Sequence, residues 1–313
     1  MKLQFINNIS LDVISGGNIY NNAVIDGLKQ TGVLIDYNAS PLEKNYDLSI
    51  IDSLCMNEIK ANTLYQNKNL IALIHQLPDL DYNTLDFYKT YSKFIVTGEP
   101  TKEVLINDWQ VNEDNISIIR PGIPEQWKTK TTFNNKPKRI IIVSNFIQNK
   151  GFEMLIKLLK RLNHLNIEFD IVGNNKLDKV YADTIIKSIK QTNANVSFHF
   201  NLTRDDMYKR LTNSDIFLSL SKSESFGMAI FEALSLGLPS IAYKTGDYKY
   251  FDNHLNYIGL DDYSENSFSK SIEEWLNNPI SYKTYCNTNI QNKRYWKQVI
   301  NEFSIYLKNT VVC

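Results

Sequence analysis

The sequence is poor in cysteine, has no excess of charge of either sign and contains no long apolar run. Its three cysteines, Cys55, Cys286 and Cys313, lie far apart and form no CxxC or Cys/His pattern. Neither disulfides nor a zinc site are therefore predicted, and a reducing cytoplasm is the expected setting. The 34 basic and 34 acidic residues balance, so no net field favours nucleic acid as a partner. The apolar runs are short or broken by charge, so a membrane-spanning helix is not expected, whereas peripheral contact with the inner face of a membrane stays open.

What the sequence does contain is enough apolar material for two cores. Its 313 residues are 43% hydrophobic, and this length exceeds what one average core holds. Short β-rich runs alternate with helix-length segments, and the alternation restarts at residue 139 after a polar stretch that contains proline. Two such sets of βα units predict an α/β fold of two doubly wound, Rossmann-like domains that face a cleft.

The composition along the chain suggests where these parts begin and end. We expect a first domain at 1–123, a linker at 124–138, a second domain at 139–285 and a terminal helical segment at 286–313. The linker is inferred because its sequence, PEQWKTKTTFNNKPK, has no periodic apolar pattern.

One short stretch, ESFGMAIFE at 224–232, places two glutamates around an otherwise apolar run. It follows a predicted strand, so Glu224 is expected in the loop after that strand and Glu232 in a buried helix that starts near Phe226. A buried carboxylate without a partner costs several kcal/mol. Two interpretations are open from the spacing alone. Either Glu232 forms a buried ion pair and Glu224 is solvated, or the helix start holds a phosphate and both glutamates bind the same ligand.

The residues around this stretch resemble the donor-binding motif of the GT-B-fold, retaining glycosyltransferases of family 4. That motif reads roughly P-S-x-x-E-x-F-G followed by E-A-x-x-x-G-x-P, with leucine here in place of the first proline. The matching residues are Ser221, Glu224, Phe226, Gly227, Glu232, Ala233, Gly237 and Pro239. The resemblance implies that Glu232 holds the ribose of a nucleotide sugar and Glu224 the sugar. The helix start at Ser225, Phe226 and Gly227 would then bind the diphosphate.

Further segments extend the resemblance over most of the chain. Gly16 and Gly17 match a glycine-rich loop near the donor diphosphate and the acceptor, although a plain turn is the other interpretation. Lys150 matches a lysine that contacts the donor phosphates, where a cation would stabilise a diphosphate leaving group. A solvated lysine is its alternative interpretation. Asn145 occupies the position of the family's arginine, so one charge is missing. The candidate replacements are Arg120, Arg204 and Lys222.

His75 ends a predicted strand and matches a histidine that lies near the donor sugar and the acceptor. The resemblance therefore groups His75 with Glu224 and Lys150 as catalytic candidates, although a histidine at a strand end is often structural. Asp79 and Asp81 could bind acceptor hydroxyls or lie solvated in a loop. The family's G-G pair is half retained, because Asp247 follows Gly246.

The activity implied by the resemblance is transfer of a sugar from a nucleotide-sugar donor to a hydroxyl of a saccharide or lipid-linked acceptor, with retention of configuration. A UDP-sugar is favoured over GDP-mannose, and no metal or further cofactor is expected. The first domain would be the acceptor side, the second would bind the donor, and the segment 286–313 would cross back to the first domain. Synthesis of a surface polysaccharide or glycolipid is the expected setting. A catalytically weak binding subunit, favoured by Asn145 and Asp247, stays open, as does a phosphorylase or epimerase.

Overall fold

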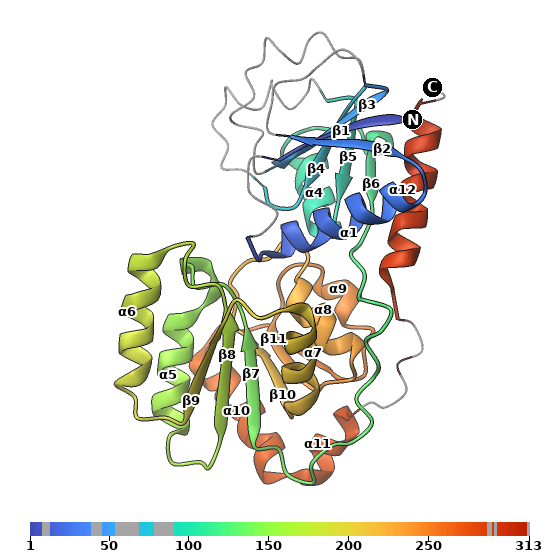
Figure 1. The fold of residues 1–313 in the computed structure, drawn as a ribbon. Helices are drawn as coiled ribbons and strands as arrows, with labels where there is room; N and C mark the ends of the chain where they lie inside the picture. The colour runs from blue at the N-terminus through green and yellow to red at the C-terminus, as the bar shows by residue number, and fades with distance from the viewer. Residues whose placement is uncertain are drawn as a thin grey trace. The chain divides into compact units, whose positions relative to one another are not determined.

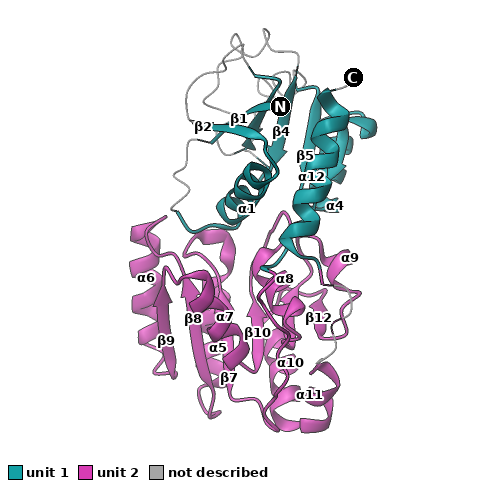
Figure 2. Ribbon diagram, turned by 45° about the vertical axis from the view of Figure 1, so that its right-hand side comes forward, with its two compact units in different colours: residues 1–124, 294–313 teal, residues 125–293 magenta. Residues whose placement is uncertain are grey.

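The computed structural model describes residues 1–7, 13–38, 46–53, 69–77, 91–286, 290 and 293–311. The chain divides into two compact units, shown in different colours in Figure 2. Unit 1 comprises Met1–Pro124 and Arg294–Cys313, and unit 2 comprises Glu125–Lys293. Each unit is built on a six-stranded parallel sheet flanked by helices (Figure 1), which confirms the predicted α/β fold with two domains. The predicted cleft between the domains stays a prediction.

Unit 1 has the strand order β2-β1-β3-β4-β5-β6. Its strands are β1 (Lys2–Ile6), β2 (Leu34–Asn38), β3 (Leu48–Asp52), β4 (Leu70–Ile74), β5 (Lys93–Val96) and β6 (Ile116–Ile118). Its helices are α1 (Gly16–Gln30), α4 (Glu99–Asn107), the short 3-10 helix η2 (Glu113–Asn115) and α12 (Trp296–Val311). Every residue of β3 and β4 is buried, as the apolar sequences of central parallel strands require.

Helix α12 joins unit 1 although it lies at the end of the chain. It packs along α1, and a Cβ added at Gly27 of α1 would lie 2.1 Å from Cδ1 of Ile300. The residue at this position must therefore be small for the two helices to approach. A parallel bridge between Ile123 and Tyr295 also ties the returning chain to unit 1. The return begins at Arg294, eight residues later than the expected segment 286–313.

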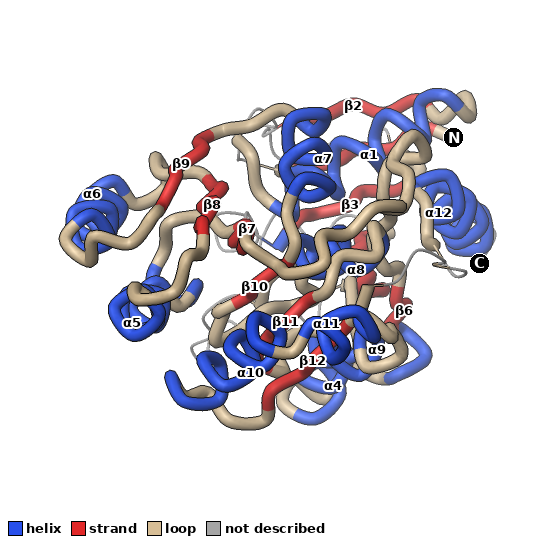
Figure 3. Tube along the Cα trace, turned by 90° about the horizontal axis from the view of Figure 1, so that it is seen from below, coloured by secondary structure: helices blue, strands red, loops and turns tan. Residues whose placement is uncertain are grey.

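Unit 2 has the strand order β12-β11-β10-β7-β8-β9. Its strands are β7 (Arg139–Val143), β8 (Glu168–Gly173), β9 (Val196–Phe200), β10 (Ile216–Ser219), β11 (Ser240–Tyr243) and β12 (Tyr257–Leu260). Its longer helices are α5 (Phe152–Leu162), α6 (Lys179–Lys190), α7 (Arg204–Asn213), α8 (Met228–Ser235) and α10 (Glu265–Asn277); the short ones are η3 (Gln148–Lys150), α9 (Tyr248–Phe251) and α11 (Pro279–Tyr285). Figure 3 shows α5 and α10 on one side of these strands and α7 and α8 on the other.

The stretch 124–138, expected to be a linker, belongs to unit 2 from Glu125 onward. Trp127 is only 1% exposed, and its ring lies 5.5 Å from that of Tyr208 on α7. The backbone N–H of Lys130 donates to the carbonyl of Leu236 at 2.8 Å. The side chains of Lys130 and Asn134 also donate hydrogen bonds, to the carbonyl of Ser214 and to Asp215. One large apolar side chain and polar contacts thus anchor this stretch, which is why it lacks the periodic apolar pattern by which sequence analysis recognises packed segments.

Candidate functional site

In unit 2, loops that follow neighbouring parallel strands are joined to one another at the carboxyl edge of the sheet. The N–H of Lys222, after β10, donates to the carbonyl of Asn149, after β7, at 2.9 Å. The N–H of Asp247, after β11, donates to the carbonyl of Phe226 at 3.0 Å. Ligands of open parallel sheets bind at this edge. The loops that carry the predicted donor site are therefore adjacent and fixed to each other.

Two glycines allow this close approach. Gly151 has φ +74°, and a Cβ there would lie 1.9 Å from the carbonyl oxygen of Leu220. Gly246 has φ +63°, and a Cβ there would lie 2.3 Å from the carbonyl oxygen of Phe226. Both the backbone conformation and the space exclude a larger residue. This explains why Gly246, the retained glycine of the family's G-G pair, is a glycine.

Lys150 and Glu224, both predicted site residues, come together across these loops. Nζ of Lys150 lies 2.7 Å from Oε1 of Glu224, and the two side chains are 17% and 25% exposed. The backbone N–H of Glu224 donates to Oγ1 of Thr245 at 3.1 Å, which fixes the loop that carries it. Glu224 therefore has a charged partner within the protein.

Helix α8 begins at Met228, two residues later than expected, with Gly227 as its N-cap at φ +107°. Phe226 is 4% exposed, and its ring packs against those of Phe231 and Phe251 at 5.4 and 5.3 Å. The Phe226 side chain thus anchors the helix start in the core. Ser225 and Gly227 flank it in the same loop.

Glu232 is buried on α8 and pairs with Arg204, the first residue of α7. Its Oε1 lies 2.5 Å from Nη2 of Arg204 and its Oε2 3.4 Å from Nη1, while the glutamate side chain is 4% exposed. The guanidinium carbon of Arg204 lies 4.6 Å from the ring centroid of Trp127, a cation–π contact. The buried carboxylate is compensated inside the protein, as the ion-pair interpretation expects, so its burial alone does not require a ligand.

The side chain of Asn145 connects two loops. Its Oδ1 accepts a hydrogen bond from the backbone N–H of Asn174, after β8, at 3.1 Å. Of the candidate replacements for the missing charge, Arg204 is held by Glu232, and Lys222 lies 5.9 Å from the ring centroid of Tyr263. Arg120 lies in unit 1, 3.4 Å from Glu99.

Unit 1 brings together the predicted residues Gly16, Gly17 and His75. The two glycines are the first residues of α1, whose N-cap Ser15 accepts a hydrogen bond from the N–H of Asn18. A Cβ added at Gly17 would lie 3.3 Å from Cδ2 of His75, so the imidazole ring packs directly against this glycine. The aspartates at 79 and 81 lie outside the described residues.

His75 directly follows β4 and contacts two buried polar residues. Its Nε2 lies 2.7 Å from Oδ1 of Asn21, and Nδ2 of Asn21 donates to Oδ2 of Asp52 at 2.6 Å. Burial lowers the pKa of His75, and the carboxylate of Asp52, 3.6 Å away, partly opposes this. Sequence analysis missed both partners. The sequence signal that could have pointed to Asp52 is its place as a polar residue at the end of β3, the strand next to β4.

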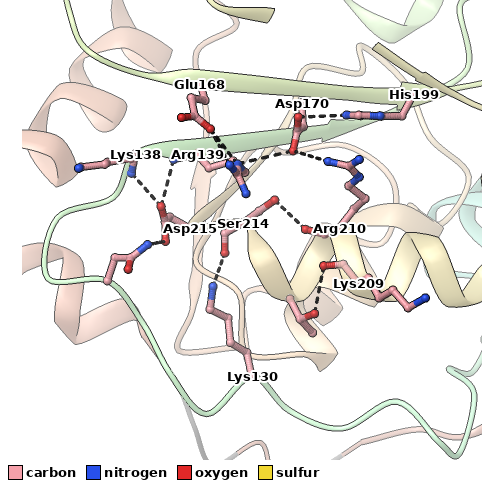
Figure 4. Close-up of polar contacts among 12 residues, drawn as sticks. Lys130, Lys138, Arg139, Glu168, Asp170, His199, Lys209, Arg210, Ser214 and Asp215 are labelled. Carbon is pink, nitrogen blue, oxygen red and sulfur yellow. Dashed lines mark hydrogen bonds and ion pairs between the residues drawn. The ribbon is translucent and has the colours of Figure 1, made fainter. Parts of the chain in front are cut away.

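A second group of charged residues lies away from these loops, around Asp170 on β8 (Figure 4). Oδ1 of Asp170 lies 3.1 Å from Nε2 of His199, and Oδ2 lies 3.8 Å from Arg139 and 3.7 Å from Arg210. Arg139 is the first residue of β7, so the group extends toward the amino end of the sheet. Its mutual charge compensation indicates a role in holding β7, β8, β9 and α7 together.

Comparison with known proteins defines the class to which the chain belongs. Residues 124–293 match the family model described as "Glycosyl transferases group 1". This match covers more than half of the chain, so the chain belongs to that family. Among curated relatives, a glycogen synthase of Thermosipho melanesiensis is 23% identical over 175 residues, which is 52% of this chain and 36% of the relative. N-acetyl-alpha-D-glucosaminyl L-malate synthase of Bacillus anthracis is 26% identical over 122 residues, 39% of this chain and 31% of that protein. The chain spans less than half the length of the curated relatives it matches.

Solved structures share the fold over nearly the whole chain. Sucrose-phosphate synthase from Thermosynechococcus elongatus has a TM-score of 0.80 at 14% identity, with 98% of each chain covered. Anabaena HepE in complex with UDP-glucose has a TM-score of 0.78 at 13% identity, with 99% of this chain and 100% of that chain covered. At such identities the likeness shows the α/β fold alone. Within the described part of the chain, no helix has the length and apolar character needed to cross a membrane.

Proposed function

We propose that the protein transfers a sugar from a nucleotide-sugar donor, a UDP-sugar in the first instance, to a hydroxyl of a saccharide or lipid-linked acceptor. The observation that carries the proposal is the meeting of Lys150 and Glu224 beside the start of α8, at the carboxyl edge of the unit 2 sheet. Both residues match the family motif. HepE, which shares the fold, was solved with UDP-glucose bound.

In the proposed reaction, the bond between the anomeric carbon and the diphosphate oxygen breaks while the acceptor oxygen attacks the same face. The departing phosphate oxygen takes the acceptor's proton, so the configuration is retained and atoms and charges balance. Lys150 would stabilise the negative charge that develops on the leaving diphosphate. Glu224 would accept hydrogen bonds from the sugar, and Glu232 from the ribose, so that the protein acts largely by positioning.

The first experiment is a thermal-shift screen with UDP, UDP-glucose and GDP-mannose, because a ligand that binds only the folded state raises its apparent stability. Release of UDP from the stabilising donor is then measured without and with saccharide acceptors. Lys150→Met should abolish turnover, whereas Lys187→Met, an exposed lysine on α6, should leave it unchanged. Nucleotide binding without turnover on any acceptor would instead identify a binding subunit.

Retention and metal independence need measurements of their own. The anomeric configuration of the product, read by NMR, should equal that of the donor, and an inverted product would refute the proposed course of the reaction. Activity should persist in a chelator, because the diphosphate charge is assigned to Lys150 and to the backbone N–H groups at the start of α8.

We place the protein in polysaccharide or glycolipid synthesis as a further part of the proposal. Binding to vesicles of anionic lipid tests contact with a membrane surface.

A further inference from the structure

His75 is held from several directions within unit 1. Its ring packs against Gly17 and forms an edge-to-face contact with Tyr20, with ring centroids 4.9 Å apart. The hydroxyl of Tyr20 is itself fixed by the carbonyl of Ile119 at 3.0 Å. The backbone N–H of His75 donates to Oγ of Ser53 at 3.1 Å. The imidazole therefore has one well-defined position at the carboxyl end of β4.

The hydrogen bonds of Asn21 determine which ring nitrogen of His75 carries the hydrogen. A carboxylate oxygen accepts hydrogen bonds, so Asn21 presents its NH₂ group to Asp52. The amide carbonyl then faces Nε2 of His75 at 2.7 Å. A carbonyl oxygen only accepts, so Nε2 must be protonated. In the neutral ring, Nδ1 keeps its lone pair.

The neutral form of the ring is the one that this environment favours. The His75 side chain is 7% exposed, and its burial lowers the pKa of the imidazole below its ordinary value. Asp52 acts in the opposite direction, but its carboxylate, which is fully buried, also receives a hydrogen bond from Asn21. Asp52 thus fixes the orientation of the Asn21 amide, and the amide in turn fixes the orientation of the His75 ring.

We propose that Asn21 and Asp52 are positioning residues that hold His75 in the tautomer protonated at Nε2, so that unit 1 offers Nδ1 as a hydrogen-bond acceptor to a hydroxyl of the substrate. Nδ1 lies across Cγ from Cδ2, the ring atom that packs against Gly17. An acceptor nitrogen at this place selects for a group that donates, and a sugar hydroxyl is such a group. The tautomer follows from the contacts alone, whereas the identity of the hydroxyl rests on the proposed function.

The tautomer is tested without any substrate. In the full chain with ¹⁵N-labelled histidine, NMR at a pH above the titration of His75 should show the neutral ring protonated at Nε2. Asp52→Asn, which keeps the size but replaces the carboxylate, should shift the population toward the other tautomer, as should Asn21→Ala. Asp26→Asn, at an exposed position on α1, the helix that carries Asn21, should leave the ¹⁵N signals of His75 unchanged. A wild-type ring protonated at Nδ1, or one insensitive to both changes, would overturn the proposal.

The use of Nδ1 is tested by two substitutions at His75 itself. The amide of His75→Asn lies near the place of Nδ1 and can still accept a hydroxyl, whereas the amide of His75→Gln lies near Nε2. Once a donor is identified, His75→Gln should lower kcat/KM about tenfold more than His75→Asn, the effect of one lost hydrogen bond. The reverse order would refute the role of Nδ1. If no donor binds at all, the proposed function fails while the NMR result on the tautomer still stands.

Discussion

Replacing Glu224 by glutamine should favour the binding of free UDP over that of a UDP-sugar. Nζ of Lys150 is paired with Oε1 of Glu224 at 2.7 Å. A diphosphate that binds Lys150 must compete with this carboxylate and also tolerate its negative charge. Glu224→Gln removes the competitor, so free UDP should bind more tightly than it does to the wild type. A UDP-sugar should gain less or lose affinity, because its sugar loses the carboxylate acceptor.

The size of the effect follows from the burial of the pair. The side chains of Lys150 and Glu224 are 17% and 25% exposed, so solvent screens part of their attraction. A pair of this kind contributes about 1 kcal/mol, which corresponds to roughly fivefold in the dissociation constant of UDP. Lys150→Met removes a charge-assisted hydrogen bond and should weaken UDP binding by about 2 kcal/mol.

Isothermal titration calorimetry of four proteins provides the measurement: wild type, each single variant and the double variant. The gain from Glu224→Gln should be smaller in the Lys150→Met background, because no pair remains to be broken and only the repulsion between the carboxylate and the diphosphate is relieved. It should also shrink at high salt. Asp183→Asn, which removes an exposed charge on α6, is the control for net charge. Equal weakening of UDP and UDP-glucose by Glu224→Gln, or an equal gain without Lys150, would refute the reasoning.

Three further predictions concern stability. Gly151→Ala should lower the free energy of unfolding by about 3 kcal/mol in urea titrations. Gly32 also has positive φ, but nothing lies within 4 Å of a Cβ added there, so Gly32→Ala should cost about 1 kcal/mol. Equal costs would contradict the close contact at Gly151. Arg204→Leu leaves Glu232 buried and unpaired and should cost about 2 kcal/mol at neutral pH, because the arginine is 33% exposed and already partly solvated. An unchanged free energy of unfolding in urea titrations would contradict the assignment of the pair. Burial lowers the pKa of His254, so this histidine binds a proton more readily in the unfolded chain than in the folded one. The stability of the fold should therefore fall as the pH drops below about 6.5. His254→Gln should weaken this pH dependence in thermal melts at several pH values.

The fold could be predicted from the sequence because its signal is local. Runs such as RIIIV and LIALI are long enough to mark buried parallel strands, and Gly32 and Gly237 mark the ends of α1 and α8. The stretch around Trp127 could not be assigned in this way. One buried indole and hydrogen bonds from backbone and side-chain groups hold it on unit 2, and neither leaves a periodic apolar pattern.

The sequence predicted the positions of site residues only where these residues lie close together in one segment of the chain. The distance from Glu224 to Glu232 along the chain places the first in a loop and the second on α8, and that arrangement is what the structure has. Their partners come from elsewhere in the chain. Arg204 is 28 positions from Glu232, and Asn21 is 54 positions from His75. Such pairs are set by how strands order themselves in a sheet, which no local pattern specifies.

The pairing of charges in unit 2 changes the significance of Asn145. Glu232 is matched by Arg204, and Glu224 by Lys150, so these four charges already balance before a donor arrives. A nucleoside diphosphate adds negative charge where the family's arginine is replaced by an amide, and that amide is engaged with the loop after β8. The anion must then be held mainly by backbone N–H groups at the start of α8 and by a lysine shared with Glu224. Hydrogen bonds to fixed backbone groups are screened by salt less than surface charges are. UDP affinity in the wild type should therefore change little with ionic strength, and Asn145→Arg should both tighten binding and make it salt-dependent.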